Sequence, residues 1–389
     1  MIIGSKELIR DINCNLVLET IIDKSPLSRA TLSKELGLTK ATISTIVQDL
    51  IDRQLVIEIG SDNTDLGRKP ILLTYNKLAG YALCIDIQPD HCSTMLSNLQ
   101  ADIIKQDSIV TPERPEDLPD ALIQYVRELL SNLATSHYGL VGITLSIHGV
   151  TYDNHVKFAP YYDLSGTHLI SKMEGQLGIP IYLENEANLS AMGESCMVYD
   201  NSNLASISVH SGIGLGLIMN NHLVKGYKGY AGEVGHTIID IDGRPCPCGN
   251  RGCLEQYVSE KALLKEFATR KGKKRAYFED FIKAYDSKDP DAKAIVDLFV
   301  KYMSVGLNNI LNSYNPEIII INSSFTSRYP ALTEEIITML SSKMNNYSSI
   351  LPSTLRGKSS LLGGLCMAIK NFLGIKYLKM HNCFDVEKI

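Results

Sequence analysis

The chain has 389 residues, of which 44% are hydrophobic and 21% are charged. These values are typical of soluble globular proteins and exclude disordered, collagen-like and coiled-coil chains, while the length predicts two or three domains. The net charge of −5 argues against a protein that coats nucleic acid through its overall charge. Any DNA binding must therefore come from a local element.

The sequence carries no evident targeting or membrane segment. Its purely apolar runs are short, as at residues 318–321, and stay far below the length of a membrane-spanning helix. The charged N-terminus lacks the apolar region of a signal peptide. We therefore expect a cytoplasmic protein without a membrane partner.

The first 75 residues predict three helices followed by a hairpin. Apolar residues at helical spacing predict the first helix. Ser28 is expected to begin a second helix that ends at Gly37, and Thr39 to begin a third that ends near residue 53. Strands are expected at 55–59 and 71–75, on either side of a polar loop. This order is typical of a winged helix-turn-helix, which we place at residues 1–78.

The third helix is the candidate DNA-reading element. In a helix-turn-helix the second helix of the motif enters the major groove and presents its N-terminal residues to base edges. The residues expected to reach DNA are small or polar: Thr39, Lys40, Ala41, Thr42, Ser44, Thr45 and Gln48. Arg68 and Lys69 place two cations at the tip of the wing, which suits phosphate or a narrow minor groove.

The alternative is a three-helix packing module whose Ser and Thr side chains are only solvated. The two cations of the expected wing favour DNA binding over this alternative. Residues 1–75 hold nine Lys or Arg and ten Asp or Glu, so this domain is not basic overall. We therefore expect DNA binding to require specific contacts and a homodimer, with a tetramer also open.

Residues 79–389 predict an α/β domain. Apolar strands are expected at 81–87, 140–147 and 317–321, and helices at 118–135, 261–268, 291–312 and near 364–372. Hairpins mixed with strand–helix units predict two lobes with a cleft between them. The sequence shows no internal repeat.

Three of the nine cysteines fall within eight residues: Cys246, Cys248 and Cys253. An odd count in a chain expected to be cytoplasmic argues against a disulfide framework. The nearest histidine is His236, and three thiolates with one imidazole are a common closed set for structural Zn²⁺. We therefore predict one zinc ion on these four residues. The alternatives are three unliganded thiols or, less in keeping with the chemistry, a disulfide within the loop.

Three segments resemble the ROK family, which comprises repressors, open reading frames and sugar kinases. They are Glu184-Asn-Glu-Ala-Asn188, Gly232-Glu-Val-Gly-His236 and the run CPCGNRGCLE at residues 246–255. The resemblance covers nearly the whole chain, includes the winged helix that only the family's regulators carry, and is strongest to the xylose-repressor type. It implies the two-lobed, actin-like sugar-kinase fold.

The chain departs from the kinases of this family at the nucleotide site. Those kinases carry an Asp–any–Gly–Gly–Thr loop whose backbone N–H groups approach the ATP phosphates. This chain has Asp86-Ile-Gln-Pro89, without either glycine and with a proline that removes a donor. Ser323-Ser324 replaces a later Gly-Gly pair, and Glu186 replaces the aspartate that serves as general base. The resemblance therefore argues against kinase activity.

The family's sugar contacts carry over, through the resemblance, to Asn185, Glu186, Glu233, His236 and Glu255. Carboxylate, amide and imidazole groups suit sugar hydroxyls, each of which both donates and accepts a hydrogen bond. The zinc loop would then hold Glu255 and His236 in place. Glu233 could contact the sugar or only cap a helix or turn. Glu184 could contact the sugar or be a surface or capping carboxylate. Whether His148 contacts the sugar is also open.

The sequence thus predicts a non-enzymatic, sugar-responsive transcriptional repressor. Residues 1–78 would bind operator DNA, and residues 79–389 would bind an aldose such as xylose and form the dimer. One alternative is a ROK sugar kinase that phosphorylates an aldose with ATP. Another is an activator or a sensor of a protein partner. The identity of the sugar, the operator sequence and the direction of the sugar's effect on DNA binding stay open.

Overall fold

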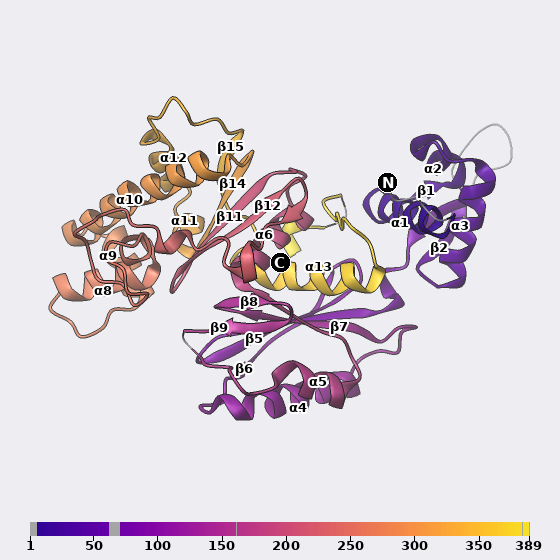
Figure 1. The fold of residues 1–389 in the computed structure, drawn as a ribbon, viewed down its shortest axis with the longest axis horizontal. Coiled ribbons are helices and arrows are strands. Elements are labelled where there is room, and N and C mark those ends of the chain that lie inside the picture. Colours follow the sequence, from indigo (N-terminus) through magenta and orange to yellow (C-terminus); the bar gives the residue numbers. More distant parts are fainter. Residues whose placement is uncertain (1–5, 62–70, 161, 383, 389) are drawn as a thin grey trace. The chain divides into compact units, whose positions relative to one another are not determined.

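The computed structural model describes residues 6–61, 71–160, 162–382 and 384–388 (Figure 1). The chain forms two compact units. The first comprises residues 1–184, 195–200 and 361–389, and the second comprises residues 185–194 and 201–360. The predicted domain boundary near residue 78 lies inside the first unit and stays a prediction. Arg68 and Lys69 lie outside the described residues.

The N-terminal module contains α1 (Lys6–Lys24), α2 (Arg29–Leu36) and α3 (Lys40–Asp52). Its sheet has the order β1-β3-β2, formed by β1 (Leu27–Ser28), β2 (Val56–Ser61) and β3 (Ile71–Tyr75). The predicted helix caps are confirmed: Ser28 Oγ accepts a hydrogen bond from the backbone N–H of Thr31, and Thr39 Oγ1 accepts one from that of Thr42. The short strand β1 was not predicted.

The rest of the first unit is built on a five-stranded sheet of order β10-β7-β4-β5-β6. Its strands are β4 (Tyr81–Ile87), β5 (His91–Asn98), β6 (Ile103–Val110), β7 (Leu140–Ile147) and β10 (Ile181–Asn185). The helices α4 (Leu118–Ser131) and α5 (Leu169–Leu177) lie together against one face (Figure 1). A two-stranded hairpin, β8 (Val150–Tyr152) and β9 (His155–Phe158), follows β7.

The helix α13 (Ser359–Leu373) lies on the other face of this sheet, and Gly364 allows its close approach. A Cβ atom at Gly364 would overlap Cys84 Sγ on β4. The Thr144 hydroxyl of β7 donates a hydrogen bond of 2.7 Å to the carbonyl oxygen of Gly364. The backbone of α13 is therefore in direct contact with β4 and β7 at Gly364.

The second unit has a sheet of order β13-β12-β11-β14-β15. Its strands are β11 (Leu204–Val209), β12 (Ile213–Met219), β13 (His222–Leu223), β14 (Ile318–Ser323) and β15 (Ser349–Pro352). One face carries α6 (Glu186–Met197), whose last residues belong to the first unit. The unit's remaining helices are α7 (Glu255–Val258), α8 (Glu260–Arg270), α9 (Phe278–Asp286), α10 (Pro290–Tyr314), α11 (Ser324–Arg328) and α12 (Ala331–Thr338).

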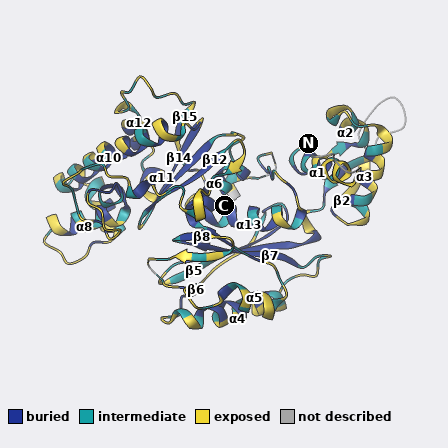
Figure 2. Cartoon of the chain, viewed as in Figure 1, coloured by how far each residue is buried: buried dark blue, intermediate teal, exposed yellow. Residues whose placement is uncertain are grey.

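The two sheets share one strand order. In each, the fifth, fourth, first, second and third strands along the chain lie side by side. This duplication is not visible in the sequence. Figure 2 shows that β7 and β14 are buried throughout, which is expected of central parallel strands covered on both faces.

The helix α10 is long and apolar enough to cross a membrane by length and composition alone. Its apolar face, however, lies in the core of the second unit, where Phe299, Met303 and Leu307 are fully buried. This placement is that of a core helix.

Candidate functional site

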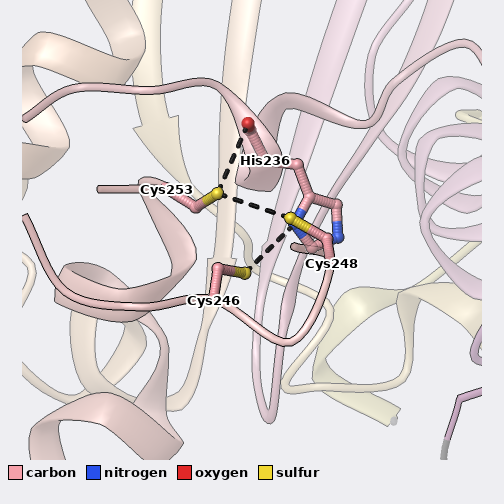
Figure 3. A group of neighbouring side chains, drawn as sticks. All are labelled: His236, Cys246, Cys248 and Cys253. Atoms are coloured by element: carbon pink, nitrogen blue, oxygen red, sulfur yellow. Dashed lines mark hydrogen bonds between the residues drawn. The ribbon is translucent and has the colours of Figure 1, made fainter. Parts of the chain in front are cut away.

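One histidine and three cysteines form a compact group in the second unit (Figure 3). The ligand atoms of His236, Cys246, Cys248 and Cys253 all lie within 4.8 Å of one another. Cys246 Sγ is 3.7 Å from His236 Nδ1, and Cys248 Sγ is 3.7 Å from Cys253 Sγ. A tetrahedral site with Zn–S bonds of about 2.3 Å has ligand separations of about 3.8 Å. The donor set and its spacing therefore fit a tetrahedral metal ion.

The loop that carries the thiols is shaped by two β-bridges and a glycine. Ile238 pairs with Cys253, and Pro245 pairs with Arg251. Gly252 has a φ of 72°, and a Cβ atom there would overlap the carbonyl oxygen of Asp240. Only glycine fits this position.

In the absence of a cation, the close packing of the three thiols disfavours the thiolate form of Cys253. Burial and the two adjacent thiols raise the pKa of Cys253 to about 12. A metal ion reverses this preference because the thiolate is the ligand form. The chemistry of the group therefore agrees with its geometry.

Segments that carry predicted sugar contacts meet at the start of β12. The backbone N–H of Ile213 donates a hydrogen bond of 3.2 Å to Glu255 Oε2. Gly235, beside His236, would meet Ile213 if it carried a Cβ atom, and Gly214 would meet Ala187 in the first turn of α6. Three separate segments thus contact two neighbouring residues of one strand.

Glu233 lies beside His236, one of the four candidate metal ligands. Glu233 Oε2 is 3.9 Å from His236 Nε2, while the other ring nitrogen, Nδ1, is the one near Cys246. Burial raises the pKa of Glu233, the nearby His236 lowers it, and the negative charge of Glu255 raises it further. The carboxylate of Glu233 and the imidazole of His236 are therefore direct neighbours.

Glu186 is held in place by two hydroxyl groups. Ser190 and Ser208 donate hydrogen bonds of 2.9 and 3.1 Å to its Oε1 atom. The preceding residue, Asn185, uses its Oδ1 atom to accept hydrogen bonds from the backbone N–H groups of Ala187 and Asn188. Asn185 therefore caps α6, a role that the sequence analysis did not assign to it.

The remaining carboxylate of this segment, Glu184, is not a surface group. It is 1% exposed and accepts a hydrogen bond of 3.2 Å from Thr151 Oγ1. The surface alternative for Glu184 is therefore wrong.

Asp86 forms a cluster that sequence reasoning missed. Ser146 and Gln88 donate hydrogen bonds of 2.5 and 2.8 Å to its carboxylate, and His148 Nε2 lies 3.3 Å from it. Burial would raise the pKa of Asp86, but hydrogen bonding from His148 and the other two groups keeps it below its usual value. Where the kinases have two glycines, this chain has Gln88 and Pro89. The Gln88 side chain donates its hydrogen bond to Asp86, and Pro89 has no N–H group to offer a phosphate.

The predicted DNA-reading residues lie on the outer face of α3. Thr39, Lys40, Ala41, Ser44, Thr45 and Gln48 are exposed, and Thr42 is half-buried. The opposite face, with Ile43, Val47 and Leu50, is buried. Gln48 Nε2 donates a hydrogen bond of 2.8 Å to Asp52 Oδ1 within the same helix.

The profile of the ROK family matches residues 82–371, so the chain belongs to the ROK family. The xylose repressor of Bacillus spizizenii is 36% identical over 383 residues, which cover 96% of this chain and 99% of that protein. The xylose repressor of Bacillus subtilis is 35% identical over 381 residues, with the same coverage.

Solved structures agree on the fold. A ROK family transcriptional regulator, described as a homolog of the Escherichia coli MLC protein, has a TM-score of 0.79 and 23% identity, and covers 97% of this chain and 99% of its own. A ROK family glucokinase from Streptomyces griseus, in complex with glucose and AMPPNP, has a TM-score of 0.65 and 23% identity over 74% of this chain and 99% of its own. The kinase-like fold expected for the larger part of the chain is confirmed.

Proposed function

We propose that this protein is a sugar-responsive transcriptional repressor whose effector is an aldose such as xylose. The observation that carries the proposal is the full-length similarity to the xylose repressors, which includes the N-terminal module. The exposed polar face of α3 supports DNA contact, with Lys40 on phosphate or guanine and the small side chains allowing close approach. A module with no excess of positive charge favours binding as a homodimer on paired half-sites.

The proposed sugar contacts are Asn185, Glu186, Glu233, His236 and Glu255. The contacts that Glu255 and the segments around Ala187 and Gly235 make with the start of β12 support this assignment. Carboxylates accept hydrogen bonds from sugar hydroxyls, and an imidazole whose Nδ1 binds metal keeps its Nε2–H as a donor. The proposed metal is one structural Zn²⁺ on His236, Cys246, Cys248 and Cys253, where it would orient the imidazole and anchor the loop that carries Glu255.

The alternative function is an ATP-dependent sugar kinase. Phosphoryl transfer relies on positioned phosphates and Mg²⁺, and in this chain the Gln88 side chain is engaged with Asp86 where the kinases have glycine. We therefore expect no sugar phosphate to form from ATP and any common aldose. ATP-dependent sugar phosphate that disappears in the Glu186→Ala variant would overturn this expectation.

The test of the proposed function is operator affinity with and without saturating xylose and other aldoses. Thermal stabilisation first identifies which sugars bind, because a ligand of the native state raises the melting temperature. A sugar that binds and changes operator affinity supports the proposal. If every sugar that binds leaves the affinity unchanged, the protein is not a sugar-responsive regulator.

A further inference from the structure

The helix α1 of the N-terminal module contacts the chain that follows α13. Glu19 Oε1 accepts hydrogen bonds from the backbone N–H groups of Lys376 and Tyr377, at 2.9 and 3.0 Å. One turn earlier, Asn15 Nδ2 donates a hydrogen bond of 2.9 Å to the carbonyl oxygen of Gly374. Each of these three hydrogen bonds joins residues more than 350 positions apart in the sequence.

These bonds are made at the point where α13 stops. Gly374, with a φ of 66°, directly follows the last helical residue, Leu373. The backbone N–H of Ile375 still pairs with the carbonyl oxygen of Lys370 in α13. The carbonyl group of Gly374 and the N–H groups of Lys376 and Tyr377 bond to α1 instead. The bonds from N–H groups to the Glu19 carboxylate are charge-assisted and are therefore among the stronger ones.

The helices α1 and α3 of the N-terminal module are in contact with each other. The buried side of α1, with Leu18 and Ile21, packs beside the buried side of α3, and Arg10 of α1 lies 3.9 Å from Asp49 of α3. A displacement of α1 therefore carries the candidate DNA-reading helix with it.

The other end of α13 is tied to α6. Ser359 Oγ, in the first turn of α13, donates a hydrogen bond of 2.8 Å to Glu194 Oε1, and Ser353 Oγ donates one of 2.5 Å to the same atom. Glu194 lies two turns after Glu186 on α6 and has no exposed surface. The helix that begins with a proposed sugar contact thus holds the beginning of α13.

The helix α13 begins in the second unit and ends in the first. Its 15 residues span about 22 Å. We propose that α13 is the coupling element between the sugar site and the DNA-reading module, with Glu19 and Asn15 as the positioning residues that connect it to α1. This inference rests on the proposed function. Sugar bound at the start of α6 would bias the position of α13 through Glu194, and α1 would follow the other end.

The test is the Glu19→Ala variant of the full-length protein, which removes the acceptor of two hydrogen bonds at a half-buried position. Glu7→Ala is the matched control, because Glu7 is an exposed glutamate of the same helix. For each protein, xylose affinity and operator affinity are measured, the latter with and without saturating xylose. Each of the other aldoses that stabilise the wild type is used in the same way.

We expect Glu19→Ala to bind sugar and, without sugar, operator within about twofold of the wild type. The factor by which sugar changes operator affinity should fall towards 1, while Glu7→Ala should keep the wild-type factor. Since coupling is reciprocal, operator DNA should also lose its effect on sugar affinity in Glu19→Ala. Asn15→Ala should reduce the factor in the same direction.

Two outcomes would overturn the inference. One is an unchanged factor in both Glu19→Ala and Asn15→Ala. The other is loss of operator binding by Glu19→Ala without sugar, which would make the contact a structural support for the module. A wild-type protein without any sugar effect on operator binding would instead contradict the proposed function itself.

Discussion

Glu255 Oε2 accepts a hydrogen bond from the backbone N–H of Ile213, and this bond ties the cysteine loop to the central sheet of the second unit. Glu255 stands two residues after Cys253, and its neighbour Gln256 donates from Nε2 to Cys246 Sγ at 3.5 Å. The same amide group lies 3.4 Å from Glu255 Oε1. The position of this carboxylate therefore depends on the fold of the thiol loop.

Metal loss should lower stability and sugar affinity together. We expect elemental analysis to find one zinc per chain in the wild type and less in Cys248→Ser. Because the loop positions Glu255, this variant should also bind an aldose roughly 10-fold or more weakly. Cys14 lies on α1, outside the group, and Cys14→Ser should change neither the zinc content nor the aldose affinity. Wild-type protein that contains no zinc would contradict the assignment.

Removal of the Glu233 carboxylate should uncouple the protein from its effector. Glu233→Ala should keep wild-type operator affinity without sugar, because the N-terminal module is untouched. Saturating xylose should leave the operator affinity of this variant unchanged. Asp242→Ala removes an exposed carboxylate of the same segment and should respond to sugar like the wild type. A full sugar response in Glu233→Ala would exclude Glu233 from the site.

Lys40 should bind a phosphate or a guanine at the start of α3. Lys40→Ala should weaken operator binding and, if its partner is a phosphate, reduce the slope of log affinity against log salt by about one, because one phosphate is no longer neutralised. Arg68→Ala should act in the same direction. Lys301→Ala, an exposed lysine of α10, serves as the control. Operator titrations at several salt concentrations check this, and wild-type affinities and slopes in both variants would remove the DNA-binding assignment.

Glu194 should make stability fall as pH rises towards neutrality. Burial raises its pKa from 4.5 to about 7, although hydrogen bonds from Ser353 and Ser359 oppose the rise. Between these values the folded state holds a proton that the unfolded state releases, so unfolding becomes easier as pH rises from about 4.5 to 7, by roughly 3 kcal/mol at most, and then levels off.

The Glu194→Gln variant tests this because its amide does not titrate. Melting temperatures measured from pH 5 to pH 8 should fall more for the wild type than for the variant. Glu334→Gln, at an exposed position of α12, should follow the wild type. Parallel curves for Glu194→Gln and the wild type would show that Glu194 titrates at its ordinary pH.

The sequence by itself determined the elements and groups that depend on neighbouring residues. The caps at Ser28 and Thr39 and the strands at 81–87 and 140–147 agree with the structure, because capping and apolar patterning are local. The metal group was also predictable, since its four residues fall within one short segment. The strand β6 was missed because it is an edge strand with an exposed, polar middle.

Only the tertiary structure decided which distant side chains meet. Asp86 and Ser146 are 60 positions apart and come together because β4 and β7 are paired in parallel. Glu194 and Ser359 are 165 positions apart, and Glu19 and Lys376 are 357 apart. No periodicity or spacing in the sequence predicts such contacts, because they arise when whole helices and sheets pack together. The apolar faces set how these elements pack, and polar side chains at their edges then bond to whichever groups lie opposite.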